Sequence, residues 1–471
     1  MSFDSITFIV FFIIVQFGYH LMSNWDNKKL LLLLSSYLFY GLWNPPYLIL
    51  LLFTTLLSLY VGNLLVSCKS QFKRKILLII GLLGTLGVLG FYKYSGFILG
   101  NIIQLFEAFG IQYRPPEIDI LLPIGISFYT FQALSYVLDC YRHTQKEPST
   151  VIDFSLYVSF FPQLIAGPIV RTSEFIPQCQ SPRDITFSHI GWGGALLVTG
   201  LFMKVVLADA FLAPVVDKVY DNYLLSGSVD TLVGILGYSG QIYFDFAGYS
   251  TCAIGVAMCF GFALPDNFRY PYSAIGFSDF WKRWHISLSK WLRDYLYISI
   301  GGNKQGRKVE YRNLMLTMLI AGLWHGASWM FVIWGGLHGL FLIIEHLVKR
   351  RFGRFFKATP GTRFYFLILT FILITLSWIP FRSPDAFVAI NIFTSLLRSG
   401  VSDVTSSLEK IEVAIVIFSM LAWQIFMRNK HLEDIVNHLG WALRVAVLVI
   451  MIVSILSVEG GESNAYIYFQ F

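Results

Sequence analysis

Charged residues are scarce in this sequence. Asp, Glu, Lys and Arg make up 13% of its 471 residues, whereas soluble domains carry about 25%. No polar block is long enough to fold as a separate soluble domain, which excludes a soluble enzyme or binding module. Hydrophobic residues make up 56% of the chain. Their long runs indicate an integral membrane protein with many spans.

Cysteines and several catalytic motifs are also few or missing. The five cysteines show no zinc or redox spacing, so neither a metal site nor a disulfide framework is predicted; they are Cys68, Cys140, Cys179, Cys252 and Cys259. The sequence has no serine nucleophile elbow, no zinc-binding H-E-x-x-H and no glycine loop that cradles phosphate. Most hydrolase, metalloprotease and ATPase functions are therefore excluded.

The formal net charge of +7 does not indicate nucleic-acid binding. The basic residues lie mainly in loops beside apolar runs, where they anchor a protein to an anionic cytoplasmic leaflet. Membrane lipids are therefore expected partners, and nucleic acid is not.

The apolar runs predict an all-α, polytopic membrane protein with about 11 transmembrane helices and additional re-entrant or interfacial helices. Residues 3–22 are expected to be a retained span rather than a cleaved signal peptide. Residues 93–118 are mixed in character and are expected at the outer surface. A short helix is expected at 384–398. The predicted spans outside the irregular segments are 4–22, 29–44, 46–67, 76–92, 190–212, 231–263, 364–381, 411–427 and 440–457.

Two segments contain helix breakers and are predicted to be irregular. Pro123 and Gly125 at the start of 121–139 indicate a broken or re-entrant helix, and 153–171 carries two prolines and a glycine. Irregular backbone at membrane depth is tolerated only against protein or a water-filled cavity. The polar residues of 121–139, which include Gln132, either form interhelical hydrogen bonds or line such a cavity. Both readings stay open.

Lys204 and Asp245 stand inside predicted spans, where ionisable residues are costly and often functional. Lys204 is expected to snorkel to the interface or to pair with Asp209 or a cavity group. Asp245 is either a functional residue or the structural partner of an arginine from the basic segment described next. Whether 231–263 is one tilted helix or a hairpin is open.

A basic segment and an apolar segment follow each other between Asp279 and His346. Residues 279–312 carry eight Lys or Arg against three acidic residues, with tryptophans interleaved, and are expected at the cytoplasmic face. Residues 313–346 contain no Lys or Arg. They are long enough for two arms of about 25 Å each, joined by a turn near Gly326. His325 is therefore expected at or near the tip of a hairpin.

His325 is the strongest catalytic candidate from the residues alone. Glycines and Trp324 surround it, and a neutral histidine can act as a general base on a hydroxyl. For the other histidines of this region, ordinary roles are expected: helix packing for His338, the membrane interface for His346 and a surface position for His285.

Six motifs resemble the membrane-bound O-acyltransferase (MBOAT) family. They are L-W-H-G at 323–326, W-K-R-W-H-I-S-L-S-K-W-L-R-D-Y-L-Y at 281–297, I-G-I-S-F-Y-T-F-Q-A-L-S-Y-V-L-D at 124–139, F-F-P-Q-L-I-A-G-P-I-V-R at 160–171, Y-F-D-F-A-G-Y-S at 243–250 and P-D-N-F-R-Y-P-Y at 265–272. The resemblance covers 120–346 within a single membrane domain at 1–471. It is greatest to the bacterial branch of the alginate O-acetylation membrane subunit and the peptidoglycan O-acetyltransferases, and P-Q-L-I-A-G-P-I-V-R favours that branch.

The resemblance implies that His325 is the active-site histidine and that His285 occupies the second signature position. It implies a tunnel that takes an acyl donor from the cytoplasm and passes the acyl group to a hydroxyl at the outer face. Trp281, Trp284, Trp291 and Tyr295 either form the mouth for the donor or anchor the interface. The predicted donor or tunnel residues are Trp281, Lys282, Arg283, Trp284, Arg293, Trp324, Asp245 and Gln132, with Lys282, Arg283 and Arg293 on the donor phosphates.

The predicted protein is thus a multi-pass enzyme of the bacterial inner membrane that acylates, and most simply acetylates, a cell-surface or exported polysaccharide. The donor is a substrate, acetyl-CoA or an acyl-carrier protein, and no bound cofactor or metal is expected. An extracytoplasmic acyltransferase partner and a polysaccharide acceptor are expected. Two alternatives stay open: D-alanyl transfer from a carrier protein to teichoic acid, and a channel or transporter without enzymatic activity.

Overall fold

The computed structural model describes residues 2–113, 115, 120–353, 359–398, 404–458 and 466–467. This part of the chain forms helices, turns and loops without a β-strand, which confirms the predicted all-α membrane fold. It groups into two compact units. Unit 1 holds Met1–Gly194 and Ala253–Pro265, and unit 2 holds Ala195–Cys252 and Asp266–Phe471. A single domain with its core at 120–346 stays a prediction.

Eight helices in the described ranges are long and apolar enough to cross a membrane. Their bounds are Pro45–Ser67, Gln71–Ala108, Phe187–Asp221, Ser228–Cys259, Trp329–Phe352, Pro360–Arg382, Ser407–Met427 and Trp441–Val458. Two further apolar helices are shorter, and they are α1 (Ile6–Leu21) and α16 (Ala386–Ser395). The multi-pass architecture is confirmed, and the expected count of about 11 spans is not.

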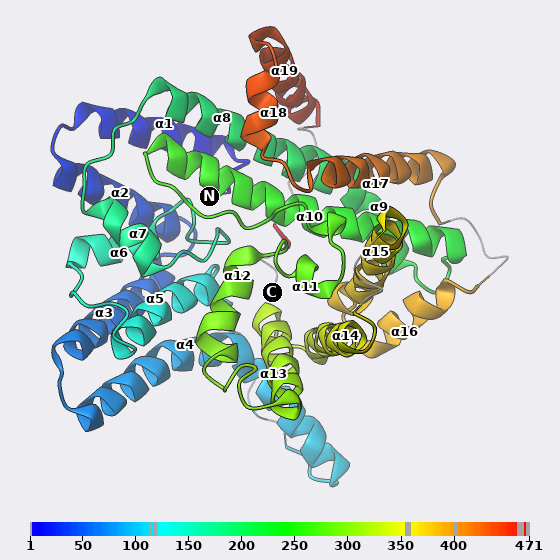
Figure 1. Ribbon diagram of the computed structural model, residues 1–471, viewed down its shortest axis with the longest axis horizontal. Helices are drawn as coiled ribbons and strands as arrows, with labels where there is room; N and C mark the ends of the chain where they lie inside the picture. The colour runs from blue at the N-terminus through cyan, green and yellow to red at the C-terminus, as the bar shows by residue number, and fades with distance from the viewer. Residues whose placement is uncertain are drawn as a thin grey trace. The chain divides into compact units, whose positions relative to one another are not determined.

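Unit 1 is built mainly from the first seven helices. Within it α3, α4 and α5 pack against one another (Figure 1). Phenylalanine rings fill another part of the unit, where Phe11 contacts Phe39 and Phe161 at centroid distances of 5.9 and 5.3 Å. Besides α1, the helices are α2 (Trp25–Gly41), α3 (Pro45–Ser67), α4 (Gln71–Ala108), α5 (Ile126–Tyr141), α6 (Val151–Ser159) and α7 (Thr172–Cys179).

Helix α4 is longer than the sequence indicated. It runs for 38 residues to Ala108, so the predicted end of this span at residue 92 is wrong. The outer-surface position expected for 93–118 stays a prediction. Residues 71–108 contain no proline, and isolated glycines weaken a helix without ending it. The chain leaves the helix only at Gly110, whose φ of +76° is left-handed.

Both irregular segments are confirmed. Helix α5 begins only after Gly125, whose φ is +75° and whose added Cβ would lie 2.7 Å from the carbonyl oxygen of Leu164. Helix α6 ends at Ser159, and residues 160–170 are buried without forming a helix. A side chain at position 125 would therefore collide with this buried loop.

The long apolar run 231–263 forms one helix rather than a hairpin. Helix α10 (Ser228–Cys259) is continuous for 32 residues. The predicted span at 190–212 is part of a longer helical run made of α8 (Phe187–Leu201), the π-helix η1 (Phe202–Leu212) and α9 (Ala213–Asp221). Such π-helical stretches are uncommon and occur frequently at functional sites.

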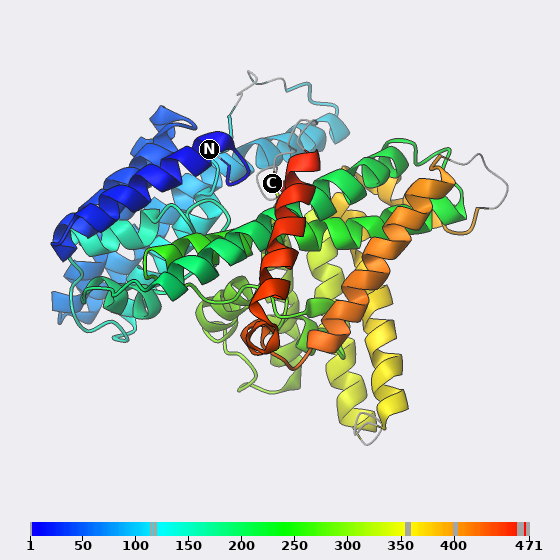
Figure 2. The same ribbon diagram turned by 90° about the horizontal axis from the view of Figure 1, so that it is seen from above.

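The basic segment is broken into short pieces in unit 2. These are α11 (Phe277–Phe280), α12 (Ile286–Trp291) and the π-helical turn η3 (Leu292–Tyr297), preceded by the 3₁₀ turn η2 (Pro271–Ser273). The hairpin then follows as predicted, with α13 (Arg307–His325) and α14 (Trp329–Phe352) joined by a three-residue turn that begins at Gly326. Helix α15 (Pro360–Arg382) packs beside α14 (Figure 2).

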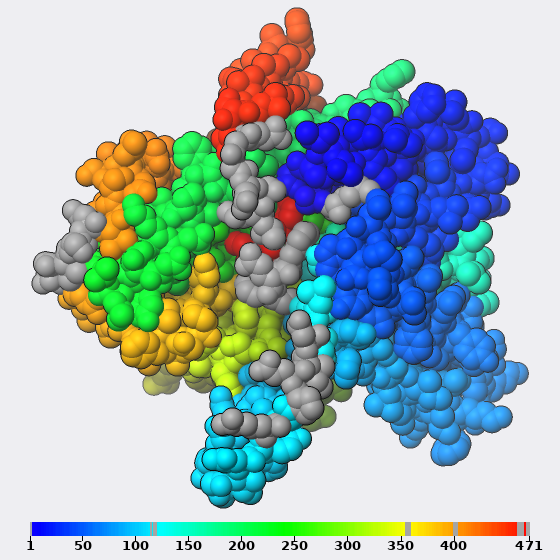
Figure 3. Space-filling model, turned by 180° about the vertical axis from the view of Figure 1, so that it is seen from behind, coloured from blue at the N-terminus to red at the C-terminus, as the bar shows by residue number. Residues whose placement is uncertain are grey.

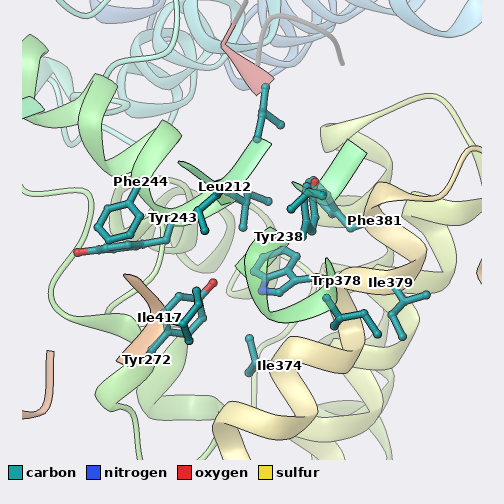
Figure 4. Close-up of a cluster of buried hydrophobic side chains, with 14 of the residues drawn as sticks. Leu212, Tyr238, Tyr243, Phe244, Tyr272, Ile374, Trp378, Ile379, Phe381 and Ile417 are labelled. Atoms are coloured by element: carbon teal, nitrogen blue, oxygen red, sulfur yellow. The ribbon is translucent and has the colours of Figure 1, made fainter. Parts of the chain in front are cut away.

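The last helices complete unit 2. They are α16, α17 (Ser407–Met427), α18 (Leu432–His438) and α19 (Trp441–Val458), and α16 confirms the short helix expected at 384–398. No residue of α19 is buried, and the helix projects at the top of Figure 3. The core of unit 2 joins residues of α10, α15 and α17 around Trp378, with Tyr238, Tyr243 and Phe381 nearby (Figure 4).

Candidate active site

The turn that carries His285 holds a strained backbone. His285 lies between α11 and α12 with φ 42° and ψ 55°, a left-handed conformation that residues with a Cβ rarely adopt. The backbone N–H of the next residue, Ile286, donates to the carbonyl oxygen of Asn267 at 2.9 Å. This bond ties the turn to a segment that precedes it by nearly 20 residues.

The side chain of His285 is completely buried. Its Nδ1 lies 3.0 Å from Oδ1 of Asn267, and its ring meets Phe246 of α10 edge-on at 4.7 Å. His285 lies outside the eight candidate spans. Burial lowers the pKa of its imidazole to about 3, because the charged form loses hydration. His285 is therefore neutral at physiological pH.

The hairpin of α13 and α14 places His325 at its tip, as predicted. His325 is the last residue of α13 and is buried. The two helices approach so closely that a Cβ on Gly322 would lie 2.1 Å from the carbonyl oxygen of Phe331, and one on Gly335 would lie 2.2 Å from that of Met318. Glycine at these two positions allows the close packing that fixes the tip.

Aromatic rings surround the imidazole of His325. Trp324, Trp334 and Phe381 lie at centroid distances of 5.1, 5.0 and 5.4 Å, each close to edge-on. These rings come from α13, α14 and α15. The imidazole of His325 is therefore enclosed on three sides by apolar rings.

The two signature histidines are neighbours in the fold, although 40 positions separate them in the sequence. Their ring centroids lie 6.3 Å apart, and Trp324 contacts both rings, at 5.8 Å from His285 and 5.1 Å from His325. The separation is too long for a direct hydrogen bond between imidazoles. It suits a pair of bases with one small polar group between them.

The third buried histidine fits the predicted packing role. Nε2 of His338 lies 3.1 Å from Oγ of Ser377, and that hydroxyl donates to the carbonyl oxygen of Ile374. The ring of His338 packs against Trp334 at 4.6 Å and Trp281 at 5.1 Å. His338 thus supports the aromatic wall behind His325.

The aromatic residues of the basic segment are more buried than expected for residues that anchor a protein at a membrane interface. Trp284 is fully buried in the core of unit 2, and Trp291 and Tyr295 are less than 9% exposed. Interfacial anchoring is wrong for these three, because their rings pack against protein rather than at a water boundary. Trp281 is half-buried and contacts Trp334 at 5.9 Å.

The predicted phosphate-binding cations have different surroundings. Lys282 and Arg293 are exposed, and Arg293 pairs with its neighbour Asp294 at 2.6 Å. Arg283 is enclosed by protein groups: Nε pairs with Asp279 at 2.9 Å, and Asp279 also pairs with Arg428. Arg283 therefore ties the basic segment to the end of α17.

Asp245 has a cationic partner outside the basic segment. Its Oδ1 lies 2.7 Å from Nζ of Lys204 on η1, and Lys204 also contacts Asp209 at 2.9 Å. Of the alternatives for Lys204, the pairing with Asp209 is confirmed. Of the two alternatives for Asp245, a structural partner is present but it is Lys204 rather than an arginine, and a functional role of Asp245 stays a prediction. Near the end of the chain, the N–H of Ile467 donates to Oδ2 of Asp245, and Nζ of Lys204 lies over the ring of Tyr466.

Gln132 belongs to unit 1. It is buried in α5, and its backbone carbonyl accepts a hydrogen bond from the Tyr157 hydroxyl at 3.0 Å. Its role on a tunnel stays a prediction. Within the described ranges, no three His, Cys, Asp or Glu side chains gather as metal ligands.

Asn267, Ser250 and Ser287 were not predicted as site residues. All three are buried, and they form one hydrogen-bonded group with His285. Asn267 stands in P-D-N-F-R-Y-P-Y, Ser250 ends Y-F-D-F-A-G-Y-S and Ser287 follows W-K-R-W-H, so each lies in a segment that carries the family resemblance. A search of those segments for short polar residues would have found them.

Comparisons with known proteins show which family the chain resembles. A sequence model described as the membrane-bound O-acyltransferase family, MBOAT, matches residues 145–379. The chain is 35% identical to the "Probable alginate O-acetylase AlgI" of Pseudomonas putida, over the full length of both. It is 31% identical to the peptidoglycan O-acetyltransferase of Helicobacter pylori, over 100% of this chain and 98% of that protein. Identity to the teichoic acid D-alanyltransferase of Streptococcus thermophilus is also 31%, but over only 48% of this chain and 58% of that protein.

Proposed function

This chain belongs to the membrane-bound O-acyltransferase family and is a multi-pass membrane O-acyltransferase, and from this premise we propose that it exports acetyl groups to a polysaccharide. In this proposal acetyl-CoA delivers the group from the cytoplasm at a bacterial inner membrane. Hydroxyls of a cell-surface or exported polysaccharide receive it, directly or through an extracytoplasmic partner protein. Full-length similarity to alginate and peptidoglycan O-acetylating proteins supports acetyl over D-alanyl transfer.

The pairing of His285 and His325 in an aromatic enclosure carries the proposal. His325 removes the proton from the acceptor hydroxyl as its oxygen bonds to the acyl carbon of the donor thioester. The carbon–sulfur bond then breaks, and the thiolate that leaves takes the proton from the imidazolium of His325. A variant of this route has the acyl group pass through His325 itself.

The cytoplasmic end of the donor is assigned to the exposed cations of the basic segment. Lys282 and Arg293 are exposed to solvent and suit the phosphates of coenzyme A, and Arg293 also pairs with Asp294. Arg283 is less exposed than Arg293 and pairs with Asp279. Trp281 and Trp324 supply aromatic surface along the route to His325, as their contacts with Trp334 and His325 support.

The test uses purified protein in liposomes with radiolabelled acetyl-CoA outside and an acceptor glycan inside. Wild type is compared with His325→Ala and with His438→Ala, a control at an exposed histidine of α18. We expect label on the glycan for wild type and the control, and a loss of about 10³-fold for His325→Ala with its fold retained. Equal turnover of His325→Ala and wild type contradicts the assignment of His325.

A second donor separates the remaining alternatives. If acetyl-CoA labels nothing while a charged acyl-carrier protein supports transfer, the D-alanylation type of donor replaces acetyl-CoA. If transfer to the glycan requires an added extracytoplasmic protein, the partner route is supported over direct transfer.

A further inference from the structure

Asn267 is buried at the centre of the group that holds His285. Its Oδ1 accepts from the backbone N–H of Ser287 at 3.3 Å and from the Ser287 hydroxyl at 2.9 Å. Its Nδ2 donates to the hydroxyl of Ser250 on α10 at 3.2 Å. Asn267 is 1% exposed, and Ser250 and Ser287 are also buried. The Asn267 side chain therefore connects His285, helix α12 that follows it, and the distant helix α10.

The contact with Ser287 settles which end of the amide faces His285. A backbone N–H can only donate, so the Asn267 atom that it meets must be the oxygen. The same oxygen lies 3.0 Å from Nδ1 of His285. Because an amide oxygen can only accept, the two atoms form a hydrogen bond only if Nδ1 of His285 carries the proton. His285 is therefore the Nδ1–H tautomer, and its Nε2 holds a lone pair.

The backbone of His285 indicates that this arrangement is enforced. The left-handed conformation at φ 42° is unfavourable for a residue with a Cβ, and it persists because surrounding contacts determine it. The bonds from Ile286 to the Asn267 carbonyl and from His285 to the Asn267 side chain supply two of those contacts. Strain of this kind is concentrated at functional sites.

We propose that Asn267 is a positioning residue for acyl transfer, which fixes His285 as the Nδ1–H tautomer so that Nε2 accepts a hydrogen bond on the side of His325. This inference rests on the proposed function, because it gives His285 the task of orienting the base. The centroid separation of 6.3 Å suits one bridging oxygen between the two imidazoles. An acceptor at His285 then holds one N–H of His325 in place and leaves its other nitrogen for the hydroxyl.

Asn267→Asp is the informative variant, since it keeps the shape of the side chain and the acceptor for Ser287. The Ser250 hydroxyl can rotate to donate to the new carboxylate, so the fold is expected to survive. A buried carboxylate beside Nδ1 favours the imidazolium, which carries a proton on Nε2 as well. Of the groups described around His285, the titratable neighbour is His325, and Phe246 and Trp324 are uncharged.

Asn313→Asp is the matched control. Asn313 is also fully buried, but its amide nitrogen donates to the carbonyl oxygens of Ile300 and Gly302, its Oδ1 accepts from the Arg312 guanidinium, and it does not take part in the His285 group. A general cost of placing a carboxylate in unit 2 therefore affects both variants. A change of His285 and of the pH profile is expected only for Asn267→Asp.

The measurement is the ¹⁵N NMR spectrum of ring-labelled histidines in detergent-solubilised protein. The signals of His285 are those that disappear in His285→Gln. Wild type is expected to show a protonated Nδ1 and an unprotonated Nε2 at His285 near neutral pH. Asn267→Asp is expected to show both nitrogens protonated. Turnover is expected to fall roughly 10- to 100-fold at neutral pH, as for other partners that orient a functional imidazole, with its acid limb moved to higher pH.

The outcomes separate this inference from the proposed function. A wild-type His285 that carries its proton on Nε2 overturns the inference without any variant or activity assay. An Asn267→Asp protein with unchanged His285 shifts, or a pH profile that moves equally in Asn313→Asp, also overturns it. If the shifts behave as expected while wild type transfers no acyl group, the tautomer assignment stands and the proposed function fails.

Discussion

Arg74 in unit 1 and His285 in unit 2 are both buried basic side chains, but their hydrogen-bond partners differ in kind. Arg74 donates to backbone carbonyls at the ends of two helices: Leu65 and Cys68 at α3, and Cys140 and Tyr141 at α5. Helix ends leave such carbonyls without partners inside the helix. Arg74 is therefore a cross-brace for two C-termini.

His285 instead takes its partner from a side-chain amide that only its tertiary neighbours hold in place. Both Nη1 and Nη2 of Arg74 donate to backbone carbonyls. In His285, by contrast, the contact of Nδ1 with Asn267 determines whether Nε2 carries a proton. The difference shows how a buried base is recognised as structural or as part of a site. A buried base whose polar atoms all bind backbone groups is structural, whereas one whose second nitrogen is directed to another functional side chain is part of a site.

The largest expected effect is on the structural side of this comparison. Arg74→Leu leaves four carbonyls, two of them in fully buried contacts, without their charged donor and is expected to lower the free energy of unfolding by about 3 kcal/mol. Turnover per folded molecule should not change. Thermal unfolding in detergent and acyl transfer by the folded fraction test this. Lys75→Leu, at an exposed position one residue away, is the control.

His285→Gln is expected to show the reverse pattern. Turnover should fall on the order of 10²-fold, equivalent to about 2.7 kcal/mol of barrier, because glutamine cannot present the imidazole Nε2. The melting temperature should change much less than in Arg74→Leu. His346→Gln, whose Nδ1 contacts a backbone carbonyl of its own helix, is the control. A large stability loss with intact turnover in His285→Gln would remove the contrast between the two residues.

Acid should destabilise the protein through His285. Its pKa is lowered to about 3 in the folded state by burial and lies near 6.5 when unfolded. Because the unfolded state binds the proton first, this contribution to stability is present above pH 6.5. It is lost by about 1.4 kcal/mol per unit as the pH falls from there towards 3. Between pH 7.5 and 5, the free energy of unfolding should fall less with decreasing pH for His285→Gln than for wild type. The same pH dependence in both proteins contradicts the prediction.

The smallest effect is expected at His338, the third buried histidine described in unit 2. Ser377→Ala removes the hydroxyl that meets Nε2 of His338 and is expected to cost about 1 kcal/mol of stability, with turnover unchanged. Ser383→Ala is matched to it, since that buried hydroxyl donates only to a backbone carbonyl of the same helix. A loss of turnover in Ser377→Ala would move His338 from the packing side of the comparison to the side of His285.

Regularities along the chain made part of this structure predictable. The run without Lys or Arg at 313–346, broken by Gly326, indicated the hairpin and placed His325 at its tip. The prolines and glycine of 153–171 indicated the irregular loop, and Lys204 was matched with Asp209 because the two lie close in sequence. Each of these depends on apolar length, helix breakers or short separation.

Predictions failed where partners are far apart in the chain. An arginine of the basic segment was one of two alternatives for Asp245, but its cationic partner is Lys204, which is 41 positions away on a π-helix. His285 was expected on the surface and is buried, because its turn is tied to Asn267. The continuation of α4 past residue 92 was also missed, since the chain becomes mixed in character there while the helix continues to Ala108.

The sequence by itself determined that this is a helical, multi-pass membrane protein of the acyltransferase family with a histidine at the tip of a hairpin. Hydrophobic length, breakers and motifs are properties of single stretches of chain. Only the tertiary structure decided that His285 lies beside His325, that Asn267 holds its Nδ1, and that Arg74 braces two helix ends. A buried polar atom must find a partner, and which atom it finds depends on the packing of elements remote in sequence.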